Sequence, residues 1–166
     1  MLHALELVPD SAGRERVRRD WEALREAGLP SQLDHRGTTN APHVTVVAAP
    51  HLDGSAERLA VATLGARLPA AVRTAGLLVL GGTRVTLARL LDVDDELTRA
   101  VLAVRDAVPD RQHRGWLPHV TLARRLTRAD VQRAVDVLGH EDVVLHLTSL
   151  RRWDPALGTV ATLTGS

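Results

Sequence analysis

The chain has 166 residues, a formal net charge of +1, and 45% hydrophobic residues. This length suits one domain with a packed interior, and the small net charge excludes a strongly basic protein that coats nucleic acid. All 21 basic residues are arginine and cysteine is absent. A lysine Schiff base, a phosphate-loop lysine, thiolate catalysis and a disulfide framework are therefore excluded.

No apolar run approaches the roughly 18 residues of a transmembrane helix, so we expect no membrane span. The first ten residues lack the pattern of a signal peptide, which predicts a cytoplasmic protein. Trp21, Trp116 and Trp153 are the only aromatic residues. An RNA-recognition sheet needs aromatic side chains on neighbouring strands, so this class of RNA-binding protein is excluded.

The first half of the chain predicts two strands and two helices. Residues 2–8 alternate and predict a strand, and a helix capped by Ser11 follows it. Its apolar face holds Val17, Trp21 and Leu24. Residues 31–42 are polar and predict a loop. The β-branched segment 43–50 predicts a second strand, and residues 55–68 predict a second helix.

The second half repeats the alternation of strands and helices. Its predicted elements are a hairpin of strands 76–80 and 84–91, a helix over 92–108, a strand over 116–126, a helix over 127–139 and a final hairpin of strands 142–153 and 158–165. The pattern predicts an α+β fold. We expect a single domain over residues 1–166, with two pseudo-symmetric lobes of antiparallel strands and flanking helices around a central cleft.

The tetrapeptide Pro-His-Val-Thr occurs twice, at 42–45 and 118–121, each time in a predicted strand. Side chains two apart on a strand share a face, so His43 lies beside Thr45. In the same way His119 lies beside Thr121, and the intervening valines point to the buried side. Repetition alone leaves open a half-exposed strand face without a catalytic role. If a pseudo-twofold axis relates the lobes, both His-Thr pairs face one cleft.

Two imidazoles and two hydroxyls facing one cavity suit general acid–base chemistry on a phosphodiester. One imidazole takes a proton and the other donates one, and each transfer contributes about 10²–10⁴-fold in rate. The threonine hydroxyls donate to non-bridging phosphate oxygens. We expect no metal and no cofactor, because neither motif adjoins a carboxylate and no H-E-x-x-H is present.

The segments PHVTV and PHVTLAR resemble the paired H-x-T-x motifs of the two-histidine (2H) phosphoesterase superfamily, in its 2′-5′ RNA ligase and cyclic phosphodiesterase-like branch. This resemblance implies metal-independent opening of a cyclic phosphodiester, notably a 2′,3′-cyclic phosphate of RNA or a nucleotide, to a 2′-phosphate. It implies catalytic roles for His43 and His119. It also implies phosphate contacts for Thr45 and Thr121.

Arg124 matches the arginine that often follows the second motif of that family. Strict alternation points its side chain away from His119, so it reaches a phosphate only if the strand bulges or ends there, and a solvated surface arginine is the alternative. Trp116 and Trp153 are the candidates for stacking on a base, with a core or lid role as the alternative for Trp116.

The sequence leaves several substrates and one other function open. With so few aromatic residues, a small cyclic nucleotide is a candidate beside an RNA end. The same chemistry on ADP-ribose cyclic phosphate or on 2′-5′ linkages is a further alternative. A non-catalytic RNA- or nucleotide-binding module on the same fold is the alternative from another class. We expect a monomer without a membrane partner.

Overall fold

The computed structural model describes residues 1–35, 37 and 39–165. Strands and helices follow one another in the order that the sequence predicts. They are β1 (His3–Pro9), α1 (Ser11–Glu26), β2 (Val44–Ala49), α2 (Gly54–Thr63), β3 (Ala70–Gly81), β4 (Arg84–Asp92), α3 (Asp95–Asp106), β5 (His119–Thr127), α4 (Val131–Leu138), β6 (Val144–Asp154) and β7 (Thr159–Gly165). Short 3₁₀ turns cover Gln32–Asp34, Gly65–Arg67 and Arg128–Asp130.

Several boundaries differ from the predicted ones, and local hydrogen bonds explain two of them. Asp10, not Ser11, caps α1, because its carboxylate accepts from the Gly13 N–H at 2.7 Å. The third helix begins after Asp94, whose carboxylate accepts from the N–H of Leu97 at 2.7 Å, so residue 92 belongs to the preceding strand.

Three other predicted segments are shorter or less uniform in the structure. The helix predicted over 55–68 ends at Thr63 and is followed by a 3₁₀ turn. The strand predicted from 116 begins at His119. The loop predicted over 31–42 contains the turn Gln32–Asp34, and its residues 36 and 38 lie outside the described residues.

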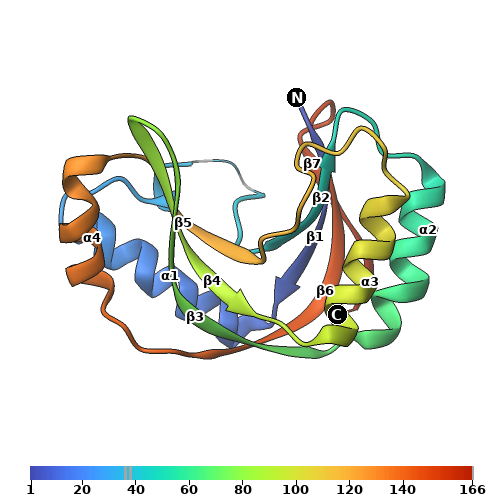
Figure 1. The fold of residues 1–166 in the computed structure, drawn as a ribbon, viewed down its shortest axis with the longest axis horizontal. Coiled ribbons are helices and arrows are strands. Elements are labelled where there is room, and N and C mark those ends of the chain that lie inside the picture. Colours follow the sequence, from blue (N-terminus) through green and yellow to red (C-terminus); the bar gives the residue numbers. More distant parts are fainter. Residues whose placement is uncertain (36, 38, 166) are drawn as a thin grey trace.

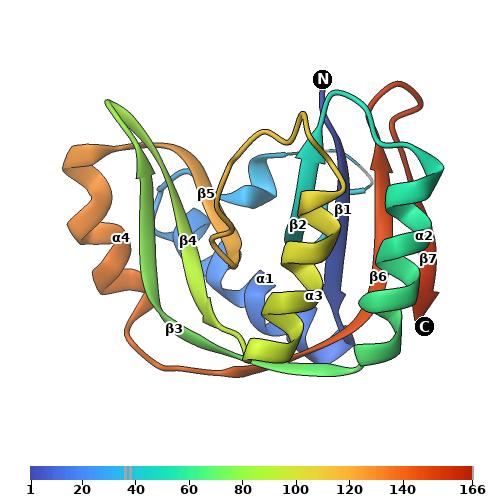
Figure 2. The same cartoon turned by 45° about the vertical axis from the view of Figure 1, so that its right-hand side comes forward.

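The strands form one antiparallel sheet in the order β1-β2-β5-β4-β3-β6-β7, with an additional β1–β6 pairing. Helices α1 and α4 pack together on one side of the molecule, and α2 and α3 pack together on the other (Figures 1 and 2). One lobe therefore holds β3, β4 and β5, and the other holds β1, β2 and β7 with most of β6. The predicted α+β class is confirmed.

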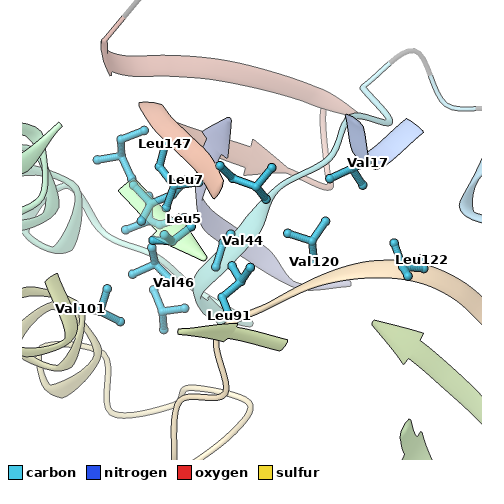
Figure 3. Close-up of a cluster of buried hydrophobic side chains, with 14 of the residues drawn as sticks. Leu5, Leu7, Val17, Val44, Val46, Leu91, Val101, Val120, Leu122 and Leu147 are labelled. Atoms are coloured by element: carbon cyan, nitrogen blue, oxygen red, sulfur yellow. The ribbon is translucent and has the colours of Figure 1, made fainter. Parts of the chain in front are cut away.

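The two lobes meet at the strands that carry the repeated motif. In the described residues β2 and β5 share a single register pair, Val44 with Val120, and each valine is only 1% exposed. Both valines lie in the buried cluster together with Leu5 and Leu7 (Figure 3). Because alternate side chains point to opposite faces, the histidines and threonines beside these valines face away from the core, as the sequence predicts.

A buried ion pair fastens the helices of one lobe to its sheet. Arg89 on β4 donates from Nε to Asp20 of α1 at 2.9 Å, and both side chains are less than a tenth exposed. A second guanidinium nitrogen donates to the main-chain oxygen of Leu138, where α4 ends, at 3.1 Å. One arginine thereby fixes both helices against the face opposite to the motif histidines.

Candidate active site

The single Val44–Val120 pair brings the two halves of the motif together. Continuing this antiparallel register places His43 across from Thr121 and Thr45 across from His119, all on one face. These four side chains are half-buried. The histidines are close enough for the charge of His43 to lower the pKa of His119.

Each motif histidine is held in the same way by its own strand. The Nδ1 atom of His43 lies 2.7 Å from the carbonyl oxygen of Ala41, and that of His119 lies 2.6 Å from the carbonyl oxygen of Leu117. A carbonyl oxygen only accepts, so each Nδ1 carries a proton and donates it. The Nε2 atom of each ring is therefore the one that can exchange a proton with a ligand.

An indole N–H anchors each motif threonine through its main chain. Trp116 Nε1 donates to the carbonyl oxygen of Thr45, and Trp21 Nε1 donates to that of Thr121, both at 3.0 Å. Because the motif strands share only one register pair in the described residues, main-chain acceptors near it need donors from elsewhere. This contact gives Trp116 an anchoring role, and its stacking on a base stays a prediction.

The His119 side of the site is dominated by burial and positive charge. Burial lowers the pKa of His119 most, and the positive charges of His43, Arg124 and His113 lower it further. The hydrogen bond to the Leu117 carbonyl acts in the opposite direction. Since an ordinary histidine has a pKa of about 6.5, the lowered pKa leaves His119 neutral at neutral pH and able to accept a proton.

The His43 side of the site contains a carboxylate that sequence reasoning missed. Glu6 Oε1 lies 3.4 Å from His43 Nε2, and Glu6 Oε2 accepts from Arg151 Nε at 2.7 Å. The Glu6 side chain is only 8% exposed. The available signal was an acidic residue between the buried Leu5 and Leu7 of a strand, since alternation turns it to the other face.

A bulge in β5 settles the direction of Arg124. Thr121 pairs with Ala88 of β4, whereas Ala123 pairs with the next residue back, Leu87, so β5 contains one extra residue at this point. The extra residue shifts the alternation by one and brings Arg124 to the face of His119. Its charge is among those that lower the pKa of His119. The strand therefore bulges before Arg124, which is the condition under which we expected this arginine to reach a phosphate.

A buried arginine without a carboxylate partner in the described residues fixes the loop that precedes β5. Arg105 of α3 donates to the carbonyl oxygens of Val46 at 2.8 Å, His113 at 2.5 Å and Gly115 at 2.7 Å. Burial lowers its pKa. Its acceptors are main-chain atoms of one motif strand and of the loop before the other, so local sequence patterns gave no sign of this role.

The comparison with known families decides the affiliation. A sequence model of the 2′-5′ RNA ligase superfamily matches residues 9–164. The chain belongs to the 2′-5′ RNA ligase superfamily. These proteins are 2H phosphoesterases, so the affiliation predicted from the two H-x-T motifs is confirmed. No curated protein sequence is significantly similar to the chain.

Solved structures share the fold of this 2′-5′ RNA ligase superfamily member at low sequence identity. Usb1 of Kluyveromyces marxianus has a TM-score of 0.57 and 14% identity, covering 98% of this chain and 97% of its own. E. coli LigT complexed with 3′-AMP has a TM-score of 0.55 and 13% identity, covering 96% and 91%. TT0787 of Thermus thermophilus has a TM-score of 0.54 and 16% identity, covering 100% of both chains.

Trp153 is the other aromatic candidate in this superfamily member. It lies two residues after Arg151 on β6 and therefore shares the face of that arginine, where it is half-buried. Its stacking on a base stays a prediction. Among the described residues no group of three or more His, Asp or Glu side chains is arranged to hold a metal ion. No helix in the described ranges has the length and apolar character to cross a bilayer.

Proposed function

We propose that this chain is a metal-independent cyclic phosphodiesterase that opens the 2′,3′-cyclic phosphate of an RNA end or a nucleotide to a 2′-phosphate. The observation that carries this proposal is the pair of imidazoles at the Val44–Val120 contact, one from each lobe, each with Nδ1 committed to a main-chain carbonyl. Membership of the 2H phosphoesterases supports it.

The surroundings of the two rings support distinct roles. His119, whose pKa is lowered, takes a proton at Nε2 from a water whose oxygen attacks phosphorus. His43, whose Nε2 faces the Glu6 carboxylate, donates its Nε2 proton to the leaving O3′ as the P–O3′ bond breaks. The phosphate stays on O2′. Proton exchange with solvent then restores both histidines.

The threonines and Arg124 serve the phosphate in this scheme. The hydroxyls of Thr45 and Thr121 lie on the histidine face and donate to the non-bridging oxygens. Arg124, turned to this face by the bulge, adds a positive charge on the His119 side. Donors fixed in advance stabilise the charge that grows on phosphorus as it becomes pentacoordinate.

The test is hydrolysis of 2′,3′-cyclic AMP in the presence of EDTA. We expect His43→Ala and His119→Ala each to lower kcat/KM by about 10²–10⁴-fold, because each removes one proton transfer. The matched control is His51→Ala, an exposed histidine just after β2, which should keep wild-type activity. Circular dichroism checks the fold of each variant.

Two results contradict the proposal: activity that EDTA abolishes, or wild-type rates in both motif variants. A panel of adenosine 2′,3′-cyclic phosphate, ADP-ribose cyclic phosphate and a 2′-5′-linked dinucleotide, with products identified by mass spectrometry, separates the substrate alternatives. Binding of these ligands without any turnover favours the non-catalytic module.

A further inference from the structure

A row of side chains crosses the sheet beside His43. Glu6 of β1 pairs with Thr45 of β2 on one side and with Arg151 of β6 on the other. Residues paired across a sheet share a face, so Glu6 and Arg151 lie on the face of the motif histidines. Their side chains are only 8% and 11% exposed. Two charged groups are thus nearly buried next to a proposed catalytic residue.

Glu6 determines how the Arg151 guanidinium is presented. It accepts from Nε at 2.7 Å, which leaves both terminal nitrogens of Arg151 for other partners. Nη2 lies 3.4 Å from His43 Nδ1, but this Nδ1 already donates its proton to the Ala41 carbonyl and offers no lone pair. In the described part of the chain, the terminal nitrogens of Arg151 therefore have no protein acceptor.

The terminal nitrogens of Arg151 are thus left for a ligand, and a guanidinium fork matches two oxygens of a phosphate. We propose that Arg151 is a further phosphate-binding residue of the site and that Glu6 positions it. This inference rests on the proposed function. Arg124 lies on the His119 side and Arg151 on the His43 side, so a phosphate between the rings receives one guanidinium from each lobe. The Glu6 charge balances that of Arg151 before substrate binds.

The neighbouring residue provides a matched control. Arg152 follows Arg151 on β6 and pairs with Leu5, so it faces the opposite side of the sheet. It forms an ion pair with Glu57 of α2, and its side chain is 24% exposed. Replacing either arginine removes the same chemical group from the same strand. Of the two arginines, only Arg151 lies beside a motif histidine, whereas Arg152 lies beside His3.

The first experiment compares Arg151→Met with Arg152→Met in hydrolysis of 2′,3′-cyclic AMP. We expect Arg151→Met to lower kcat/KM by about 10²–10³-fold, the usual loss for one donor to developing charge. Arg151→Lys, which keeps a point charge without the fork, should fall between wild type and Arg151→Met. Arg152→Met should stay within about threefold of wild type.

The second experiment measures phosphate binding without turnover, by calorimetric titration with adenosine 2′-monophosphate and with inorganic phosphate. Arg151→Met should weaken both affinities at least about tenfold, and Arg152→Met should not. Glu6→Gln should weaken them in the wild-type background and have no further effect in Arg151→Met. A purely structural role for Glu6 gives equal losses in both backgrounds.

These readouts separate the failure of the inference from that of the proposed function. Absence of cyclic phosphate hydrolysis removes the proposed function, while an Arg151-dependent phosphate affinity still supports the inference. Wild-type kcat/KM and phosphate affinity in Arg151→Met overturn the inference and leave the function standing. If Arg151→Met does not fold because Glu6 is left unpaired, the double variant Glu6→Gln/Arg151→Met removes both charges and is judged by the same two measurements.

Discussion

At the residue scale, the two motif histidines have the same neighbours in sequence and different neighbours in space. Both donate from Nδ1 to the carbonyl two residues back. His119 is surrounded by positive charges, whereas the Nε2 atom of His43 faces the Glu6 carboxylate. A repeated tetrapeptide thus places two imidazoles in different electrostatic surroundings, because Glu6 and Arg124 lie outside the repeat.

This asymmetry predicts how the rate depends on pH. In the proposed mechanism His119 must be neutral, so kcat/KM should fall as pH drops through its pKa, and the lowered pKa places this acid limb below about 6.5. Arg124→Gln removes one of the positive charges that lower this pKa. The acid limb should therefore move to higher pH, in addition to any loss of rate.

The control for this prediction is Arg99→Gln, which removes an exposed arginine from α3. Its acid limb should coincide with that of the wild type, since Arg99 is not among the groups that shift the pKa of His119. Profiles of kcat/KM from pH 4 to 9 compare the acid limbs of the two variants with that of the wild type. An unmoved limb in Arg124→Gln, or equal movement in both variants, counts against the base role of His119.

Site residues could be predicted from the sequence only where side chains alternate regularly between the two faces of a strand. The alternation is regular at 43–45 and 119–121, so the sequence alone predicted which face the histidines, the threonines and the valines occupy. It failed at Arg124, because the bulge in β5 depends on the register with β4. Glu6 and Arg151 were missed because their contact joins positions 145 residues apart.

At the element scale, each motif strand is held by an indole from outside the motif. Trp21 comes from α1 and is 1% exposed, and Trp116 comes from the loop before β5. They bind the carbonyls of Thr121 and Thr45 through contacts that span 100 and 71 positions. Helix and loop thereby position the two strands at the point where the lobes meet.

Replacing these indoles by phenyl rings tests the anchoring. Trp21→Phe and Trp116→Phe remove an N–H and leave a carbonyl without its donor, which should lower the free energy of unfolding by about 1–3 kcal/mol each. Both should also reduce kcat/KM, because the threonine strand loses its fixed position. Urea unfolding and steady-state kinetics measure the two effects.

Trp153→Phe is the matched control, since the Trp153 indole N–H has no acceptor among the described residues. It should change the free energy of unfolding by less than about 1 kcal/mol. Equal destabilisation in all three variants means that ring volume, and not the N–H donor, is what the strands require.

At the scale of the whole molecule, β6 belongs to both lobes. Its first part pairs with β3 at Val144–Leu147, and its later part pairs with β1 and β7. The order of elements could be predicted, because each begins and ends at recognisable turn and cap residues. The strand order could not, because pairings such as β1–β6 and β2–β5 join segments far apart in the chain.

The shared strand predicts that the lobes unfold together. Breaking either lobe exposes apolar surface on β6 that the other lobe also uses, so neither half is a stable product. Urea unfolding followed by circular dichroism and by tryptophan fluorescence should give one coincident transition. Single-tryptophan variants that retain Trp21 or Trp153 report the two lobes separately, and distinct midpoints for them contradict the prediction.

The contact between β2 and β5 brings together two imidazoles whose surroundings can change independently by substitution. Each imidazole has a charged neighbour from outside its own copy of the repeated tetrapeptide, Glu6 for His43 and Arg124 for His119. A substitution at either position changes the surroundings of one imidazole and leaves the main-chain hydrogen bonds of both rings in place. In this fold, two copies of a motif can diverge in chemistry while their amino-acid sequences stay identical.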